Sequence, residues 1–220
     1  ETTDQYSAGI DFGFVNNRIT GSLDVYVKKT TDLLSNIKVP AGSNFSNFID
    51  TNIGSMEARG IELALQAIPV ATENLTWNLG FNFTYATNEI TNLLLVKDPN
   101  FTGLERGNIG VAQNIQNHQV GFAPFSFFTY QQVYDNNGKP VEGLYVNRSG
   151  DAVPVVGNTL NRYRPAKPTF DYLMGINSRV NYKAWDFSFS GRISIGNYVY
   201  NNNIASRAFY NNVYQLGFLS

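Results

Sequence analysis

The sequence contains no cysteine among its 220 residues, which removes several kinds of chemistry at once. Disulfide bonds, thiolate metal sites and cysteine nucleophiles are excluded, so stability must come from packing and strand pairing. The single histidine, His118, is not accompanied by a serine or cysteine motif, as an assembled catalytic site would require. We therefore expect a protein that is not an enzyme, and no motif predicts a cofactor.

Charge and long hydrophobic runs are also scarce. Charged residues make up 15% of the chain and the net charge is -1, so no clustered basic face predicts nucleic acid as a partner. The longest aliphatic run is residues 93–96, far below the roughly 18 residues of a membrane helix. No signal peptide begins at Glu1, which suggests a cytoplasmic protein or part of a longer precursor.

What the sequence has is alternation of apolar and polar residues. In residues 4–15 the apolar side chains are Tyr6, Ala8, Ile10, Phe12 and Phe14, whereas the residues between them are small or polar. A period of two predicts a strand with one apolar face. Asn16 and Asn17 then predict a tight turn, because asparagine tolerates left-handed backbone conformations.

The same pattern predicts six strands in all, near residues 4–15, 18–30, 58–68, 75–88, 170–182 and 185–196. Short turns follow the first, third and fifth strands. The other strands are followed by long connections near residues 31–56, 91–169 and 197–220. Short turns on one side and long loops on the other are typical of outer-membrane barrels. The sequence therefore predicts an all-β, transmembrane antiparallel β-barrel with long extracellular loops.

A soluble β-sandwich also alternates and is the main alternative fold. Its strands are shorter, with a mode of about 5–6 residues, and it does not require lopsided loops. Aromatic residues also gather near the short turns, as in the girdle of a membrane barrel; they are Phe12, Phe14, Trp77, Tyr182 and Trp185. Closed single-chain barrels need at least 8 strands, so we expect the 220 residues to be an internal part of a larger barrel.

Several runs resemble a known family in both strands and loops. They include residues 9–14 (GIDFGF), 40–45 (PAGSNF), 52–57 (NIGSME), 142–145 (EGLY) and 194–200 (SIGNYVY). The chain resembles the C-terminal part of the barrel of SusC-like TonB-dependent outer-membrane transporters, the SusC/RagA family of Bacteroidetes. The likeness extends over essentially the whole chain.

The resemblance implies a 22-stranded barrel in the bacterial outer membrane that imports nutrients. It implies three partners: TonB, which supplies energy, a SusD-like surface lipoprotein that covers the barrel as a lid, and the surrounding outer-membrane lipid. The family's N-terminal plug domain is absent from these residues. The expected cargo is an oligosaccharide. An oligopeptide importer of the same fold and a non-transporting surface β-protein or adhesin remain as alternatives.

Aromatic residues in the expected outer loops are candidates for binding cargo. Those singled out are Phe45, Phe48, Tyr130, Tyr134 and Tyr145. Aromatic faces stack on the apolar face of sugar rings, while polar neighbours supply directional hydrogen bonds. The same residues also serve protein interfaces. Packing within the loops or against the lid is the favoured interpretation.

Charged residues on the polar faces of the strands are candidates for lining the lumen. They are Asp11, Asp24, Lys28, Glu62, Arg179 and Arg192. Charged groups inside a membrane protein face its interior, where they line a path or pair with one another. The sequence leaves both roles open.

A last candidate is the turn from Asn147 to Asp151. Relatives in the family often carry an acidic, calcium-loop-like run here. Calcium takes 6–8 oxygen ligands, but this turn keeps only the carboxylate of Asp151. We therefore expect a degenerate, calcium-like turn that is structural, and no metal site.

Overall fold

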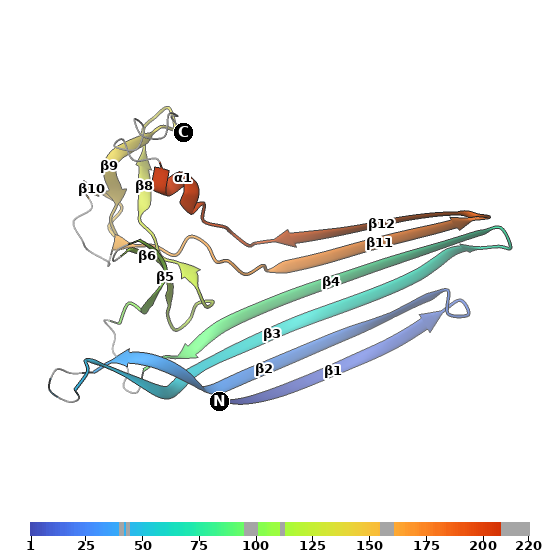
Figure 1. Ribbon diagram of the computed structural model, residues 1–220, viewed down its shortest axis with the longest axis horizontal. Helices are drawn as coiled ribbons and strands as arrows, with labels where there is room; N and C mark the ends of the chain where they lie inside the picture. Colours follow the sequence, from blue (N-terminus) through green and yellow to red (C-terminus); the bar gives the residue numbers. More distant parts are fainter. Residues whose placement is uncertain (40–41, 43–44, 95–100, 111–112, 155–160, 208–220) are drawn as a thin grey trace.

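The computed structural model describes residues 1–39, 42, 45–94, 101–110, 113–154 and 161–207. Its main feature is a six-stranded sheet in the order β1-β2-β3-β4-β11-β12, with antiparallel neighbours. Figure 1 shows the strands side by side, with short turns at one end and longer connections at the other. The expected all-β, antiparallel architecture is confirmed.

The large sheet is formed by β1 (Thr2–Phe14), β2 (Ile19–Lys38), β3 (Phe48–Ala71), β4 (Leu75–Asn92), β11 (Tyr172–Tyr182) and β12 (Trp185–Ile195). Between β4 and β11 lie β5 (Leu104–Gly110), β6 (Gln113–His118), β7 (Ser126–Phe127), β8 (Gln131–Tyr134), β9 (Pro140–Val146) and β10 (Ala152–Pro154). One helix, α1 (Asn202–Arg207), follows β12. Among the described residues, no helix is long and apolar enough to cross a membrane.

The connection expected near residues 31–56 is mostly strand. β2 continues to Lys38 and β3 begins at Phe48, so the two strands form a long hairpin. The pairing register shifts between Thr30 and Leu33. After such a shift, the side chains of the strand lie on the opposite face from the one that strict alternation predicts. The alternation that was used to find strands is therefore broken here, although the ladder of backbone hydrogen bonds continues.

The other differences have similar causes. The third strand was expected to end at Pro69, but β3 runs on to Ala71. A register shift between Ala67 and Val70 accommodates the proline, which has no N–H for the ladder. The connection expected near 91–169 contains β5 to β10, whose short strands carry no sustained alternation, and the one near 197–220 contains α1.

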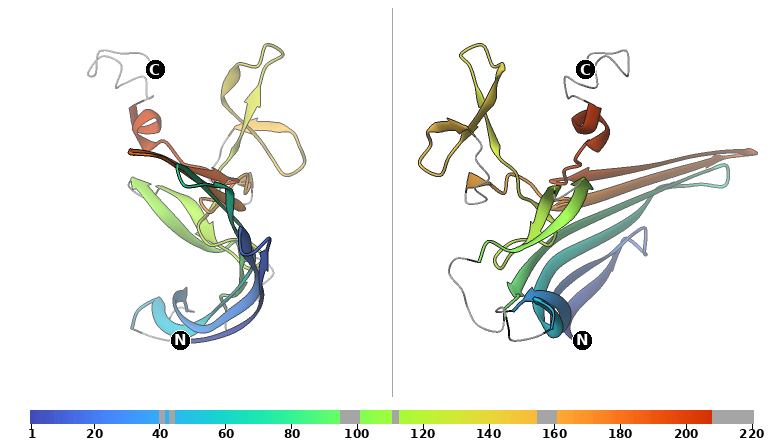
Figure 2. Two further views of the ribbon diagram at one scale, coloured as in Figure 1. Left: turned by 90° about the vertical axis from the view of Figure 1, so that its right-hand side faces the viewer. Right: turned by 60° about the vertical axis from the view of Figure 1, so that its left-hand side comes forward.

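The large sheet has one apolar and one polar face. Side chains on the apolar face are exposed, including Tyr6, Ile10, Ile176 and Phe187. Figure 2 (left) shows the sheet as an arc, with β5 and β6 on its concave side and β8 to β10 projecting away from it. The segment between β4 and β11 contacts the polar-face positions Asn88 and Ile90, so the polar face is concave and the apolar face is convex.

The convex apolar face has the height of a membrane. Along β4 its apolar side chains run from Leu75 to Tyr85. Ten steps of about 3.3 Å, tilted by about 40°, span roughly 25 Å, which is the height of the lipid-facing band of outer-membrane barrels. Above Tyr85 the same face of β4 carries Thr87 and Glu89, so the band ends there.

A row of charged residues crosses four strands just above this band. Asp4 is paired in register with Lys29, Lys29 with Glu57, and Glu57 with Glu89. The Lys29 Nζ atom lies 3.6 Å from Glu57 Oε2, and Arg59 also pairs with Glu57. The change from aromatic and aliphatic residues to charges marks the level at which lipid tails give way to a polar environment.

Glycines on the concave face make room for long polar side chains. Gly60 lies directly opposite Tyr26, and Gly175 directly opposite Asn82. A Cβ atom at Gly60 would meet the Tyr26 ring, and one at Gly175 would meet the Asn82 amide. The polar side chains can therefore lie across the neighbouring strand only because the facing residue has no side chain.

Candidate functional site

We call residues 101–171, between β4 and β11, the insert; its part that contains β5 and β6 folds back over the concave face at the loop end of the strands (Figure 2). Backbone hydrogen bonds attach the insert to β4, from Ile90 N to Phe122 O (3.0 Å) and from Gly121 N to Ile90 O (2.9 Å). Its last residue, Asp171, is bonded to both neighbouring strands, through Ala86 N and Ile195 O. The insert is thus fixed to the inner wall at three points.

The buried apolar side chains of the described residues lie in the insert and near the loop ends of the long strands, beyond the apolar band. They are Ile37, Ile90, Leu93, Ala123, Phe127 and Phe128. Three come from the loop ends of β2 and β4, and three come from the insert. Burying apolar surface is the main stabilising contribution to packing, so the insert is held against the wall by a small core of its own.

Arginines and aromatic rings alternate through the insert. The Arg164 guanidinium lies 4.6 Å from the centroid of Phe122 and 4.3 Å from that of Phe128. Arg162 follows, 5.6 Å from Phe128 and 5.3 Å from Tyr130. Each contact of this kind contributes about 0.5–2 kcal/mol, depending on its burial. We call this group, with Tyr145, the arginine–aromatic column.

The column is completed by polar contacts. Arg164 donates a hydrogen bond of 3.0 Å to the Thr102 carbonyl, and Arg162 pairs with Glu105 at 3.2 Å. Burial lowers the pKa of Arg164, and the nearby charge of Arg148 lowers it further. Guanidinium nevertheless stays protonated in proteins, so Arg164 is a half-buried cation that the rings on both sides stabilise.

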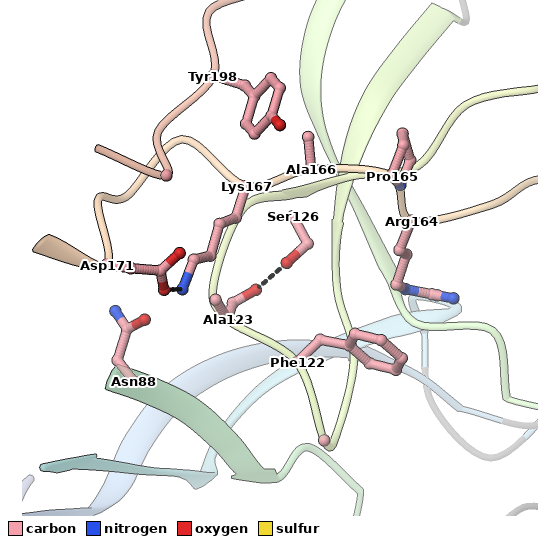
Figure 3. A pocket seen from close by; sticks show the side chains of 12 residues that line it. Asn88, Phe122, Ala123, Ser126, Arg164, Pro165, Ala166, Lys167, Asp171 and Tyr198 are labelled. Atoms are coloured by element: carbon pink, nitrogen blue, oxygen red, sulfur yellow. Dashed lines mark hydrogen bonds and ion pairs between the residues drawn. The ribbon is translucent and has the colours of Figure 1, made fainter. Parts of the chain in front are cut away.

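A polar cavity of about 340 Å³ opens where the insert meets β4 and the end of β12 (Figure 3). Asn88 comes from β4, Lys167 and Asp171 from the insert, and Tyr198 from the chain after β12. Lys167 Nζ and Asp171 Oδ1 form an ion pair of 2.5 Å. In Figure 3 the Asn88 amide points toward this pair and the Tyr198 ring lies on the opposite side.

Backbone hydrogen bonds hold the walls of this cavity. Tyr198 N donates to Lys167 O at 3.0 Å, and Asp171 N donates to Ile195 O at 2.9 Å. Gly196 has a φ of 89°, a conformation that favours glycine. A Cβ atom there would meet the Asp171 carboxylate. The chain can therefore turn sharply after β12 and bring Tyr198 over the cavity.

A second cavity, of about 460 Å³, lies deeper between β2, β3 and the insert. It is mostly apolar, and its lining includes Leu33, Met56, Phe125 and His118. The His118 ring packs edge-on against Phe125 at 4.4 Å between centroids. Burial lowers the pKa of His118, with Arg106 lowering it further. His118 is therefore a neutral packing residue, as its isolation in the sequence indicates.

The expected lumen charges lie on the polar, concave face. Arg179 is paired with Asp186, with 2.9 Å between Nε and Oδ2. Asp24 lies directly opposite Glu62, two like charges side by side. Within the described residues no ion pair forms at five of the six positions, namely Asp11, Asp24, Lys28, Glu62 and Arg192. Unpaired groups of this kind are suited to contact water or cargo.

The expected loop aromatics do not form one cluster. Tyr130 and Tyr145 pack against each other, with 5.5 Å between ring centroids, inside the arginine–aromatic column. Phe45, Phe48 and Tyr134 are exposed on separate segments, at the β2–β3 connection and on β8. The set therefore divides into rings used for packing within the insert and rings on the surface.

The turn at Asn147 is held by its own side chain. The Asn147 Oδ1 atom accepts hydrogen bonds from the backbone N–H groups of Ser149 (2.9 Å) and Asp151 (2.8 Å). Gly150 supplies a positive φ of 92°. Asp135 closes the β8–β9 turn in the same way, with bonds of 2.8 Å from Asn137 and Lys139. The side-chain oxygen at position 147 is thus engaged in holding a turn.

The sequence did not single out the residues of the polar cavity. Asn88 belongs to a strand pattern that looks like any other polar position, and Lys167, Asp171 and Tyr198 lie in connections. The one available signal is the spacing of Lys167 and Asp171, whose opposite charges are four residues apart and form an ion pair. Their meeting depends on the pairing of β4 with β11 and β11 with β12, which connects residues about 80 positions apart.

Comparison with known proteins places the chain in a family. The model of the family described as "TonB dependent receptor-like, beta-barrel" matches residues 1–203. TonB-dependent receptor SusC from Bacteroides thetaiotaomicron is 44% identical over 213 residues, covering 94% of this chain and 21% of that protein. TonB-dependent receptor P39 from Formosa agariphila is 30% identical over 244 residues, covering 91% of this chain and 22% of that protein.

Solved structures agree on the fold. The RagAB peptide transporter matches with a TM-score of 0.67 at 22% identity, covering 88% of this chain and 21% of that one. The RagAB peptide importer in its open-open state gives 0.69 at 22% identity, covering 89% and 20%. The chain spans about a fifth of the length of the curated relatives it matches. It belongs to the TonB-dependent receptor β-barrel family of the bacterial outer membrane, and within that family it is SusC-like.

Proposed function

We propose that the protein containing this chain imports oligosaccharides across the outer membrane as a TonB-dependent transporter. Its partners would be TonB and a SusD-like surface lipoprotein. The observation that carries the proposal is the polar cavity on the concave face, which combines an aromatic ring, an amide and a carboxylate next to the insert. These groups suit a neutral cargo rich in hydroxyls.

The charged residues of the concave face extend this path along the wall. Asp11, Asp24, Lys28, Glu62, Arg179 and Arg192 are proposed to line the lumen. They are separated by many small or amide side chains, such as Asn78, Asn82 and Asn177. A wall of this kind offers many weak hydrogen bonds, which lets a polar cargo move without being trapped at one point.

An oligopeptide importer is the second candidate. The structural neighbours bear titles naming a peptide transporter, but their 22% identity supports the shared fold alone. A peptide binder captures chain termini or charged side chains with free charges. In the polar cavity the main charges, Lys167 and Asp171, already neutralise each other, which favours a neutral cargo.

Calorimetric titration of the purified full-length transporter with its lipoprotein partner tests the cargo. The panel would contain neutral oligosaccharides of several linkages, uronic-acid oligomers and peptides of similar length. We expect measurable heat for at least one neutral oligosaccharide and none for the peptides. Binding of peptides alone would contradict the proposal, and the absence of any binding would favour a surface protein without transport.

A further inference from the structure

The polar cavity is sized and lined for a single small unit of a longer molecule. Its volume of about 340 Å³ is at the lower end of the range of about 300–1,000 Å³ typical of small-molecule pockets. It lies where the insert meets β4 and the chain after β12 (Figure 3). A volume of this size can hold a ring-sized group.

Two of its polar groups are unused. Within the described residues, neither the Asn88 amide nor the Tyr198 hydroxyl has a hydrogen-bond partner, although both face the cavity. Tyr198 is 59% exposed, so its ring is not covered by the described parts of the chain. An open aromatic ring beside a free amide provides a stacking surface and directional hydrogen bonds at the same place.

The charges around the cavity favour a neutral ligand. Asp171 and Lys167 form an ion pair, which leaves carboxylate lone pairs and ammonium protons for hydroxyl groups without a net charge to balance. Arg164 also borders the cavity, but its guanidinium is held between Phe122 and Phe128 and donates to the Thr102 carbonyl. The contacts of the Arg164 guanidinium are therefore with residues of the insert.

The backbones that carry these groups are held in place before any ligand arrives. Asp171 is anchored by its backbone to β4 and β12, Tyr198 by its backbone to Lys167, and Asn88 by its position in β4. Binding to groups that are already ordered costs less conformational entropy than binding to mobile loops. The backbone of the site and the Lys167–Asp171 pair are thus preformed.

We infer that this cavity is a subsite for one neutral sugar ring of the cargo. Tyr198 stacks on the apolar face of the ring, while Asn88 and the Lys167–Asp171 pair hold its hydroxyl groups. The inference rests on the proposed function, since it names the place on the wall where an oligosaccharide is held. It differs from the expectation that the exposed loop aromatics bind cargo.

Affinity of variants tests the subsite, with the neutral oligosaccharide that binds the wild-type full-length complex in calorimetry as the probe. Tyr198→Ala should weaken its binding about tenfold, since it removes the stacking surface. Tyr198→Phe keeps the ring and should stay within about twofold. Asn88→Ala should weaken binding about fivefold through a lost hydrogen bond. Tyr134→Ala, at an exposed ring on β8, serves as the control and should have no effect.

The outcomes separate the two proposals. Equal affinity for the wild type, Tyr198→Ala and Asn88→Ala would overturn the subsite, while oligosaccharide import would stand. A loss of affinity in Tyr134→Ala alone would also overturn it and move the binding surface to β8. If only peptides bind the wild type, both proposals fail. Because Tyr198 is largely exposed, its replacement should leave the barrel folded, as gel migration before and after heating would verify.

Discussion

Arg164 shows how much of the insert depends on single side chains. It connects Phe122 and Phe128 by its flat guanidinium and reaches the Thr102 carbonyl with one of its N–H groups. Burying a cation is costly unless partners replace its water. Here two rings and one carbonyl replace part of that water, although the Nε–H group has no hydrogen-bond partner among the described residues. The insert in turn supplies the wall that carries Lys167 and Asp171.

Replacing Arg164 by alanine should therefore loosen the insert and leave the large sheet intact. Two cation–aromatic contacts and one charged hydrogen bond are lost, which should lower the local stability by about 2–3 kcal/mol. Hydrogen exchange of the full-length protein should become at least about tenfold faster at backbone amides of β6 to β9, and stay unchanged in β1 to β4. Lys139→Ala, at an exposed turn residue, is the control. Unchanged exchange in the insert would show that the column is not what holds it.

Single-residue roles were predictable only where a residue's own neighbours in sequence define them. The turn role of Asn147 follows from its local pattern, and the isolation of His118 indicated a packing residue. Asn88 and Tyr198 could not be found in this way, because each acquires its role from strands that are distant in sequence. The same holds for Tyr130, whose partner Arg162 lies 32 positions further on.

At the scale of strands, alternation of apolar and polar residues is found only where a strand lies in the membrane. Inside the apolar band each strand must present one apolar face, so alternation identified all six strands. Beyond the charged row of Asp4, Lys29, Glu57 and Glu89, water reaches the convex face and that constraint ends. The hairpin of β2 and β3 continues through this region without the pattern, and its length was therefore underestimated.

Two positions on β1 test where the band lies. Ile10 and Thr2 both belong to the convex face, Ile10 in the middle of the apolar run of β1 from Tyr6 to Phe14 and Thr2 beyond the charged row. Ile10→Arg should lower the unfolding free energy of the full-length barrel in lipid vesicles by about 2–4 kcal/mol, because a cation is costly at the bilayer midplane. Thr2→Arg, the same change near the interface, should cost about 0–1 kcal/mol. Equal effects in denaturant titrations would contradict the assigned depth.

At the scale of the whole molecule, this chain is part of a wall. Its convex face is apolar, its concave face is polar, and the part of the insert that contains β5 and β6 folds over the concave face at the loop end (Figure 2). The fold could be read from alternation, because the lipid boundary imposes it on the strands. The family could be read from runs of residues in strands and loops. The inward folding of the insert could not, since it depends on a small core at Ile90, Phe127 and Phe128.

Uptake by cells tests the central claim, that this wall belongs to an importer of neutral oligosaccharides. Cells lacking the gene and cells complemented with the wild-type gene would receive a labelled oligosaccharide chosen by calorimetry. The account predicts that uptake is lost on deletion, restored by the wild-type gene and abolished when the proton gradient is collapsed. Unchanged uptake of the oligosaccharide after deletion, with uptake of labelled peptides lost instead, would contradict it.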